Sequence, residues 1–575
     1  MELLRRIFGL NYNTMYKSSL YVLTLCLLNG FAQSLSAQGE PFTSRTVVSG
    51  LNSAWEVLYG PNDSLWVTEN RSYLISRISI ANGTKTVLVD LRATDGTINF
   101  LASSPNQPQG GLMGLAIHPN LYSTDAATRA AKPWVYAAYV YNKGVCPGSN
   151  TSCIYTTKIV RFDYDGNTLT NPTTIINTIP GSSDHNSGRL VISPVIEPGA
   201  DAAHTQYRLY YTVGDMGAGQ FLNTTRAENA QVLNNLEGKV LRLNTESDGD
   251  AGQDAWIPND NPFFNASSIT AQDYVFTLGH RNAQGLAWGN VNGTNILYST
   301  EQMDRTDDEI NIITAGKNYG WDQVSGYCDD NVNGYKIGQN TSANENAFCS
   351  VPANNHQEPI FTTFTEPASG MAALMAQSNN QLWPTIASSS VDFYSSGKIS
   401  GWKYSLFISP LKKDRVYRVK LNADGSDVVG DTIPYFAGNG NRIRRIRVSP
   451  DGLKFYVARD VGATSNAGAI MEYTYAGTVL SLNENPAEGP ARVNDMISIY
   501  PNPVTDILNI HGKRDLRKPL FAQIMDINGR ILLTGSSFRN DFTMDVQALQ
   551  AGTYFLKLYN GNNMEVQVVK FVKVK

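Results

Sequence analysis

The chain has 575 residues, of which 42% are hydrophobic and only 17% are charged. This composition supplies enough apolar side chains for a large core and excludes an intrinsically disordered protein. The formal net charge of −4 is spread along the chain, so the sequence lacks the clustered basic surface of a nucleic-acid-binding protein. Because 575 residues exceed one ordinary domain, we expect more than one folded unit.

The first 37 residues have the features of a secretory signal peptide. Arginines near the start precede a short apolar run at 20–28, and small-residue cleavage sites follow at Ala32 and Ala37. A membrane anchor is the alternative, but it would need about 20 apolar residues, and Asn29 ends this run too early. The segment therefore predicts an exported protein with residues 1–37 removed.

Four of the five cysteines follow the predicted cleavage sites. An even number in an exported protein favours disulfides, and the pairs Cys146–Cys153 and Cys328–Cys349 would each close a short loop. A zinc site is the alternative. The sequence has no C-x-x-C spacing, and no histidine is expected to cluster with the cysteines, so we predict disulfides.

Residues 44–477 repeat one pattern: a glycine-bearing strand, a turn rich in Pro, Asp or Gly, and then an aromatic strand. The pattern occurs at 55–67, 111–141, 190–213, 285–299 and 446–458. Strands that recur in this way are typical of the blades of a β-propeller. The pattern predicts an all-β propeller without fixing the number of blades, and it leaves a β-helix or a sandwich open.

A second unit follows a break in this pattern. Residues 478–496 are polar and rich in turn-forming residues, which is typical of a linker. Short alternating runs then predict a small β-sandwich over 497–575. These runs lie at 497–500, 507–511, 521–526, 531–534, 553–559 and 564–574.

Three segments of this tail have distinctive sequences: SIYPNPV at 498–504, DINGR at 526–530 and LQAGTY at 549–554. The tail resembles the C-terminal sorting domain of type IX secretion substrates. This resemblance implies the type IX secretion machinery as a partner. It also implies a protein that is secreted from a Gram-negative bacterium or stays attached to its outer surface. A carbohydrate-binding or adhesion sandwich is the alternative.

Polar loops directly before predicted strands supply the candidates for chemistry. His185 and His280 both lie in such loops, although a histidine beside an aspartate is as often structural as catalytic. The acidic segment 301–309 suits a hard cation such as calcium. Arg442 and Arg444 alternate along one strand and could clamp carboxylates. Either charged segment could instead be a solvated edge.

A set of short motifs spans residues 44–477 in order. The motifs are QGGL at 109–112, DHNSG at 184–188, GDMG at 214–217, LGHRN at 278–282, EQ at 301–302, DDE at 307–309, NYGW at 318–321, WPT at 383–385, PLK at 410–412 and RIR at 442–444. As a set they resemble the soluble pyrroloquinoline-quinone-dependent glucose dehydrogenases and their aldose dehydrogenase relatives. The resemblance implies a six-bladed β-propeller that oxidises the C1 hydroxyl of an aldose sugar to the lactone and transfers hydride to the quinone.

The same resemblance implies roles for individual residues. His185 would be the general base, oriented by Asp215, and Arg281 would stabilise charge on the quinone. The cofactor would contact Arg281, Asn282, Gln302, Trp383, Thr385, Lys412, Arg442 and Arg444. The sugar would contact Gln109, Asp184, Gln220 and Phe221. Calcium would bind the carbonyls of Met303 and Asp304, with further calcium near Glu309, Tyr327 and Asp329.

Two departures from the family pattern leave the sugar unassigned. Met303-Asp304 stands where the family usually has Gly-Pro, and Asn380 stands where an aromatic residue is expected. A cell-surface propeller that binds sugar without turning it over is the alternative function. A lactonase-type hydrolase is disfavoured because it would not need the Lys412 and arginine set. The electron acceptor is not identified by the sequence, and a homodimer is left open.

Overall fold

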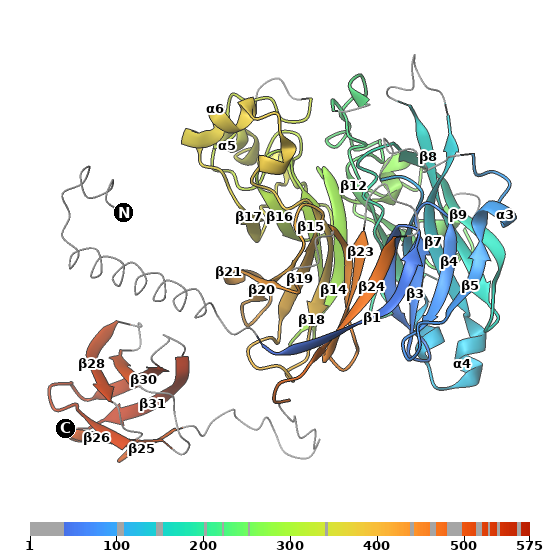
Figure 1. Ribbon diagram of the computed structural model, residues 1–575. Helices are drawn as coiled ribbons and strands as arrows, with labels where there is room; N and C mark the ends of the chain where they lie inside the picture. Colours follow the sequence, from blue (N-terminus) through green and yellow to red (C-terminus); the bar gives the residue numbers. More distant parts are fainter. Residues whose placement is uncertain are drawn as a thin grey trace, which may run out of the picture. The chain divides into compact units, whose positions relative to one another are not determined.

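The computed structural model describes residues 40–99, 109–144, 153–199, 204–220, 223–250, 254–339, 343–437, 442–460, 467–479, 497–512, 520–526, 530–537, 541–560 and 565–574. The chain divides into two compact units, one ending at Ser481 and the other spanning Leu482–Lys575 (Figure 1). The predicted signal peptide lies outside the described residues, as does most of the predicted linker.

Among the described residues, the first unit contains six four-stranded antiparallel sheets. The first has β2 (Ala54–Gly60), β3 (Ser64–Glu69), β4 (Leu74–Ser79) and β5 (Lys85–Asp90). The second has β6 (Leu112–Ile117), β7 (Trp134–Lys143), β8 (Tyr155–Tyr164) and β9 (Leu169–Gly181). The third has β10 (Leu190–Ile192), β11 (Arg208–Val213), β12 (Lys239–Asn244) and β13 (Val275–Leu278).

The remaining sheets complete this unit. The fourth has β14 (Asn282–Val291), β15 (Thr294–Gln302), β16 (Asp308–Ile312) and β17 (Phe361–Thr363). The fifth has β18 (Ser388–Tyr394), β19 (Ser405–Pro410), β20 (Val416–Leu421) and β21 (Val428–Tyr435). The sixth has β22 (Arg442–Val448), β23 (Lys454–Asp460), β24 (Gly468–Tyr475) and, from the other end of the unit, β1 (Phe42–Leu51).

The helices in the described part of the chain are short. They are α3 (Leu91–Thr94), η2 (Pro119–Tyr122), α4 (Ala126–Ala131), η4 (Asp254–Trp256), η5 (Ala271–Tyr274), α5 (Glu345–Cys349), η6 (Pro352–Asn354), α6 (Ala368–Ala376) and η7 (Asn380–Leu382). Among the residues described, none of the helices has the length and apolar character needed to cross a membrane.

The six sheets form a closed ring. Their first strands contact one another in order: β2 with β6, β6 with β10, β10 with β14, β14 with β18, β18 with β22, and β22 with β2. Strand β1 pairs with β24 from Phe42 opposite Tyr475 to Leu51 opposite Gly468, and Figure 1 shows this blue strand beside the orange β24. A ring of radially repeated sheets is a β-propeller, so the predicted all-β propeller class is confirmed.

A buried ion network joins the first strands at the centre of the ring. Glu56 on β2 accepts hydrogen bonds from Arg189, next to β10, and from Arg445 on β22. Arg189 also donates to the carbonyls of Gln284 on β14 and Ser389 on β18, at 2.9 Å each. Burial alone would raise the pKa of Glu56, but the two guanidinium groups hold it below its usual value. The network therefore fixes five of the first strands to one another.

The second unit contains two sheets. One consists of β25 (Ile497–Tyr500), β26 (Ile507–Gly512) and β29 (Asp541–Asp545). The other consists of β27 (Leu520–Met525), β28 (Ile531–Ser537), β30 (Gly552–Asn560) and β31 (Glu565–Lys573). Side chains from both sheets, such as Leu508 and Leu556, share one buried cluster. Strand β29 was not among the predicted strands, although its DFTMD sequence alternates.

Candidate functional site

The predicted site residues gather where the first strands of the propeller begin. His185 lies in the loop before β10, Arg281 directly precedes β14, and Arg442 and Arg444 lie at the start of β22. Gln302 ends β15, the neighbour of β14 in the fourth sheet. The ring therefore brings together residues that are far apart in the sequence.

His185 and Asp215 form a buried hydrogen-bonded pair. The distance from His185 Nδ1 to Asp215 Oδ1 is 2.7 Å, and both side chains are at most 5% exposed. Gln220 Nε2 lies 2.7 Å from His185 Nε2, and Asp184 Oδ2 lies 3.9 Å from the same nitrogen. Asp215 thus fixes one ring nitrogen, while the other faces two predicted sugar-binding residues.

The loop that carries His185 has an unusual backbone. His185 has a φ of 47°, in the left-handed region that costs energy for residues other than glycine. The Asn186 side chain holds this conformation by accepting from Ser182 N at 2.8 Å and donating to Ser182 O at 2.8 Å. A Cβ atom on Gly214 would lie 1.8 Å from His185 O, so only glycine allows Asp215 to follow so closely.

Gln109 connects the His185 loop to the fourth sheet. Its Oε1 accepts from His185 N at 3.1 Å, Asn282 Nδ2 at 3.2 Å and Gln284 Nε2 at 2.8 Å. Asn282 Nδ2 also donates to Gln302 Oε1 at 3.1 Å, and Gln302 donates in turn to the fifth sheet. These amides position the loop relative to the proposed cofactor residues.

Arg281 extends across the same space. Its guanidinium donates to Gln302 O at 3.1 Å, to Met303 O at 2.6 Å and to Gln220 Oε1 at 3.0 Å. The Asp304 carboxylate lies 3.8 Å away. Gln220 therefore bridges His185 and Arg281, and the carbonyl of Met303 already faces a positive charge.

His280 supports Arg281 indirectly. Its Nδ1 lies 2.9 Å from Glu301 Oε2, and the other oxygen of this carboxylate accepts from Arg281 N. The His280 ring also stacks on Tyr319 with centroids 4.6 Å apart. His280 is fully buried and holds Glu301 rather than facing the open site.

Lys412 stands beside the WPT segment. Its ammonium donates to Trp383 O at 2.9 Å and Thr385 Oγ1 at 2.8 Å. Burial lowers the pKa of Lys412 to about 8, an effect that the Asp308 carboxylate partly offsets. The Trp383 indole donates to Gln377 O at 2.8 Å.

The two predicted arginines of β22 have different surroundings. Arg444 is buried and donates to Asp460 Oδ2 at 3.0 Å and to Gln284 Oε1 at 2.9 Å. Arg442 is 39% exposed in its side chain and lies 3.9 Å from Asp460. A single carboxylate therefore serves both arginines.

Two residues without a predicted role complete the site. Trp321 Nε1 donates to Asp215 Oδ2 at 3.0 Å, and its ring lies under Arg281 at 5.2 Å. Asp308 accepts from the backbone amides of Met303 at 3.0 Å and Ala387 at 2.7 Å. Both residues lie within motifs of the sequence, but only the folded chain shows what they contact.

A group of acidic residues surrounds the predicted calcium segment. Glu309 is buried and accepts from Gly326 N at 2.9 Å. Burial and the Glu301 carboxylate raise the pKa of Glu309 well above its usual value. Asp329 N donates to Tyr327 O at 2.9 Å, so both predicted residues lie in one tight turn.

Glu345 is an acidic residue that the sequence analysis missed, and Asp307 belongs to the predicted acidic segment 301–309. Burial raises the pKa of Glu345 to about 8, and repulsion from Asp329 and Asp307 adds to this. Burial also raises the pKa of Asp307 to about 6. One carboxylate oxygen of each residue is buried without a hydrogen-bond partner among the described residues. Such oxygens fit a cation.

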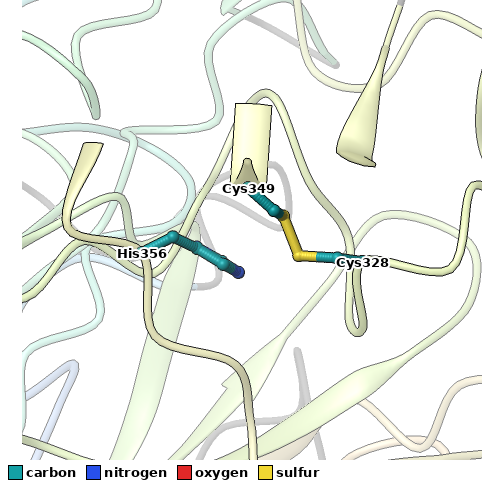
Figure 2. Close-up of side chains that lie close together, drawn as sticks. All are labelled: Cys328, Cys349 and His356. Carbon is teal, nitrogen blue, oxygen red and sulfur yellow. A yellow bond between two sulfur atoms is a disulfide. The ribbon is translucent and has the colours of Figure 1, made fainter. Parts of the chain in front are cut away.

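The predicted disulfide between Cys328 and Cys349 is present, and it joins the turn of Tyr327 and Asp329 to α5. Figure 2 shows the ring of His356 pointing toward this disulfide. Ligand atoms of the three residues lie within 4.8 Å of one another, so the expectation that no histidine clusters with the cysteines is wrong. Two residues of the other predictions, Cys146 and Phe221, lie outside the described residues.

Comparisons with known proteins show the family of each unit. The glucose/sorbosone dehydrogenase family model matches residues 51–360 and 354–471, and a secretion system C-terminal sorting domain matches 498–574. Over 495 residues the chain is 31% identical to quinoprotein glucose dehydrogenase B of Acinetobacter calcoaceticus, covering 77% of this chain and 93% of that protein. Over 235 residues it is 33% identical to an aldose sugar dehydrogenase of Escherichia coli, covering 40% of this chain and 50% of that protein.

The fold is also similar to solved structures. The apo form of a soluble aldose sugar dehydrogenase from Escherichia coli aligns with a TM-score of 0.51 at 22% identity, covering 76% of this chain and all of the other. The matched residues include the whole described site, and the resemblance stated from the sequence motifs is confirmed. The chain therefore belongs to the glucose/sorbosone dehydrogenase family and carries a secretion system C-terminal sorting domain.

Proposed function

We propose that this protein is a pyrroloquinoline-quinone-dependent dehydrogenase that oxidises the C1 hydroxyl of an aldose sugar to the lactone. The observation that carries the proposal is the buried His185–Asp215 pair, whose second ring nitrogen is bonded to Gln220, which also accepts from Arg281. A base and a cation that share one neighbouring side chain suit proton removal from a sugar and charge stabilisation on an acceptor.

The residues present fit a cofactor that carries several carboxylates. Lys412, Arg442 and Arg444 bring three positive charges to one end of the site, and Asp460 is the carboxylate that pairs with the two arginines. Arg442 Nε is buried without a hydrogen-bond partner among the described residues. Thr385 and Trp383 lie beside Lys412, where they would contact the rings of the cofactor.

Calcium fits two places in the same unit. The carbonyl of Met303 accepts from Arg281 at 2.6 Å, so this oxygen lies among the candidate cofactor residues. We propose that Met303 and Asp304 hold the cofactor's calcium through their carbonyls. Glu309, Asp329 and Glu345 would supply further oxygen ligands, which calcium prefers.

The residues of the chain would have different roles in the sugar oxidation. Pyrroloquinoline quinone supplies the two-electron acceptor, while the protein positions the reactants. His185 Nε2 takes the proton of the C1 hydroxyl, and Asp215 stabilises the imidazolium that forms. Gln220 bonds to this nitrogen, so the sugar hydroxyl has to replace its amide. Asp184 and Gln109 then orient the other hydroxyls of the sugar.

The second unit supports an extracellular location for this chemistry. We propose that the six sheets act as the six blades of one propeller and that the two C-terminal sheets form a sandwich. The type IX secretion system would recognise the sandwich. It would then export the protein to the outer surface of a Gram-negative bacterium or release it. The electron acceptor would then be extracellular or bound to the surface.

Reconstitution tests the function directly. The purified full-length protein is incubated with calcium and pyrroloquinoline quinone, and oxidation of aldoses is followed with a dye acceptor. We expect turnover that depends on quinone, together with release of lactone. Sugar binding without turnover in the fully reconstituted protein would instead support the non-catalytic carbohydrate-binding alternative. Omission of either calcium or quinone provides the control.

A further inference from the structure

A second group of metal-binding side chains lies away from the catalytic residues. His204 precedes β11, and Asp248 and Asp250 follow β12. Strands β11 and β12 pair antiparallel, so these three residues, the His204 cluster, lie at one end of the third sheet. Asp215 follows the opposite end of β11. The His204 cluster is therefore separate from the site described above.

The spacing within the His204 cluster suits one ion. His204 Nε2 lies 3.7 Å from Asp250 Oδ2 and 4.0 Å from Asp248 Oδ2, and one ligand atom from each residue lies within 4.8 Å of the others. Ligand atoms about 2.0–2.2 Å from a common ion are themselves about 3–4 Å apart. The Asp248 side chain is only 1% exposed, so its charge is removed from water.

Neighbouring amides hold both carboxylates in place. Asn244 Nδ2 donates to Asp248 Oδ2 at 2.7 Å, and Asn259 Nδ2 donates to Asp250 Oδ2 at 2.9 Å. The buried Arg208 donates in turn to the amide oxygen of Asn244. Such hydrogen bonds from outside the ligand set orient metal ligands in proteins and contribute to metal affinity.

Unsatisfied oxygens beside the cluster point independently to a cation. Asp254 Oδ1 and Asn259 Oδ1 are buried and have no hydrogen-bond partner among the described residues. Asp248 N donates to the carbonyl of Ala255 at 3.2 Å, so the adjacent Asp254 lies beside the cluster. A buried acceptor without a donor costs about 1–3 kcal/mol. A bound cation would satisfy these oxygens and neutralise the carboxylates.

We propose that the His204 cluster, together with Asp254, binds a divalent transition-metal ion such as Zn²⁺. An imidazole among carboxylates favours such an ion over calcium, which takes oxygen ligands. The ion ties the segment before β11 to the loop after β12 and stabilises this end of the third sheet. The site is structural and is independent of the sugar chemistry.

Zinc titration of the full-length protein tests the site. The protein is treated with a chelator, returned to excess calcium to fill the calcium sites, and titrated with Zn²⁺ by calorimetry. We expect the unchanged protein to bind one zinc ion more than His204→Gln or Asp250→Asn, or to bind it at least tenfold more tightly. The control Asp165→Asn, which removes an exposed turn carboxylate elsewhere, should bind as the unchanged protein does.

The variants distinguish this site from other zinc-binding groups. Zinc bound near His356 would be common to every variant and would cancel in the comparison. Equal stoichiometry and affinity in all four proteins would overturn the proposal. Full displacement of the ion by millimolar calcium would overturn the transition-metal assignment. If Asp250→Asn does not fold, His204→Gln decides, because it keeps all carboxylates and a side chain of similar size.

Discussion

His185 has a strained backbone conformation, and neighbouring residues hold both its backbone and its ring in place. Its φ of 47° is held by Asn186 and by the close approach of Gly214, and its ring is held by Asp215. A residue kept in an unfavourable conformation by surrounding structure is typical of functional sites. The loop thus fixes the imidazole before a substrate arrives.

The first prediction concerns His185 as general base. His185→Gln should lower kcat by about a hundredfold to ten-thousandfold, because general-base assistance has this range. Quinone retention and KM for the sugar should change much less, since the base acts mainly in the transition state. Steady-state kinetics of the reconstituted variant measure both quantities.

His280→Gln is the matched control for this experiment. His280 contacts Glu301 rather than the open site, so its loss should reduce kcat less than the loss of His185. Near-normal turnover of the His185 variant with added quinone and calcium would contradict the general-base role. This would hold even if the unchanged protein is an active dehydrogenase.

The second prediction concerns the pH dependence of cofactor binding. Lys412 has a pKa lowered to about 8, so it is charged below that pH and loses its charge above it. Affinity of the protein without cofactor for the carboxylates of the quinone should therefore fall as pH rises through about 8. The loss should be on the order of ten- to hundredfold, as expected for a charge-assisted hydrogen bond.

Lys412→Arg is the variant that tests the cause. Arginine stays protonated across this range, so the fall in affinity should move to higher pH. Fluorescence or calorimetric titration with quinone between pH 6 and about 10 measures the effect. A profile that is identical in the two proteins would exclude Lys412 as the titrating group.

Individual strands are joined at the centre of the ring by the charges around Glu56. The third prediction is that Glu56→Gln lowers the free energy of unfolding by about 3–5 kcal/mol, because Arg189 and Arg445 lose their buried partner. Denaturant unfolding of the first unit measures the loss. Arg45→Gln is the control, since the Arg45–Glu472 pair is partly exposed and such pairs contribute about 0–1 kcal/mol.

The loop between β16 and β17 carries buried acidic residues beside a hydrophobic cluster, and we propose that calcium stabilises it. The fourth prediction is that chelation lowers Tm and releases the cofactor, because a ligand bound by the native state adds RT ln(1 + [L]/Kd). Glu345→Gln should reduce the calcium-dependent rise in Tm, and Asp165→Asn should not. An unchanged Tm and unchanged cofactor retention after chelation would argue against calcium in this loop.

The candidate catalytic residues and the sorting domain lie in different units of the molecule. All described catalytic candidates lie in the first unit, and the second unit matches a sorting domain. The fifth prediction is that a chain truncated after Gly477 folds and keeps full specific activity toward aldoses, while its export fails. Loss of activity in a truncated protein whose propeller is still folded would show that the tail contributes to the site.

The repeated sequence pattern corresponds to the first two strands of five sheets. Strands β18 and β19 of the fifth sheet did not stand out, and neither did the outer strands such as β5 and β21. Outer strands are partly exposed on both faces, as the burial of β21 shows, so their sequences carry little alternation. The pairing of β1 with β24 joins the two ends of the propeller and leaves no local signal in the sequence.

The candidate site residues that stand in short motifs could be selected from the sequence. His185, Asp215 and Arg281 were selected in this way because their neighbours in the sequence are distinctive, and the fold brings them together, although their roles stay predictions. Glu345 and Asp254 were not selected, because each stands in a segment with no recognisable spacing.

The sequence by itself determined the all-β class, the family, the disulfide between Cys328 and Cys349, and the presence of a sorting tail. These features follow from local patterns and motifs, which can be recognised in one sequence without the fold. Only the tertiary structure decided that Gln220 bridges His185 and Arg281, that His356 lies beside the disulfide, and that His204 meets Asp248 and Asp250. The physical reason is that contacts between distant segments depend on ring closure and strand pairing, which no local sequence pattern specifies.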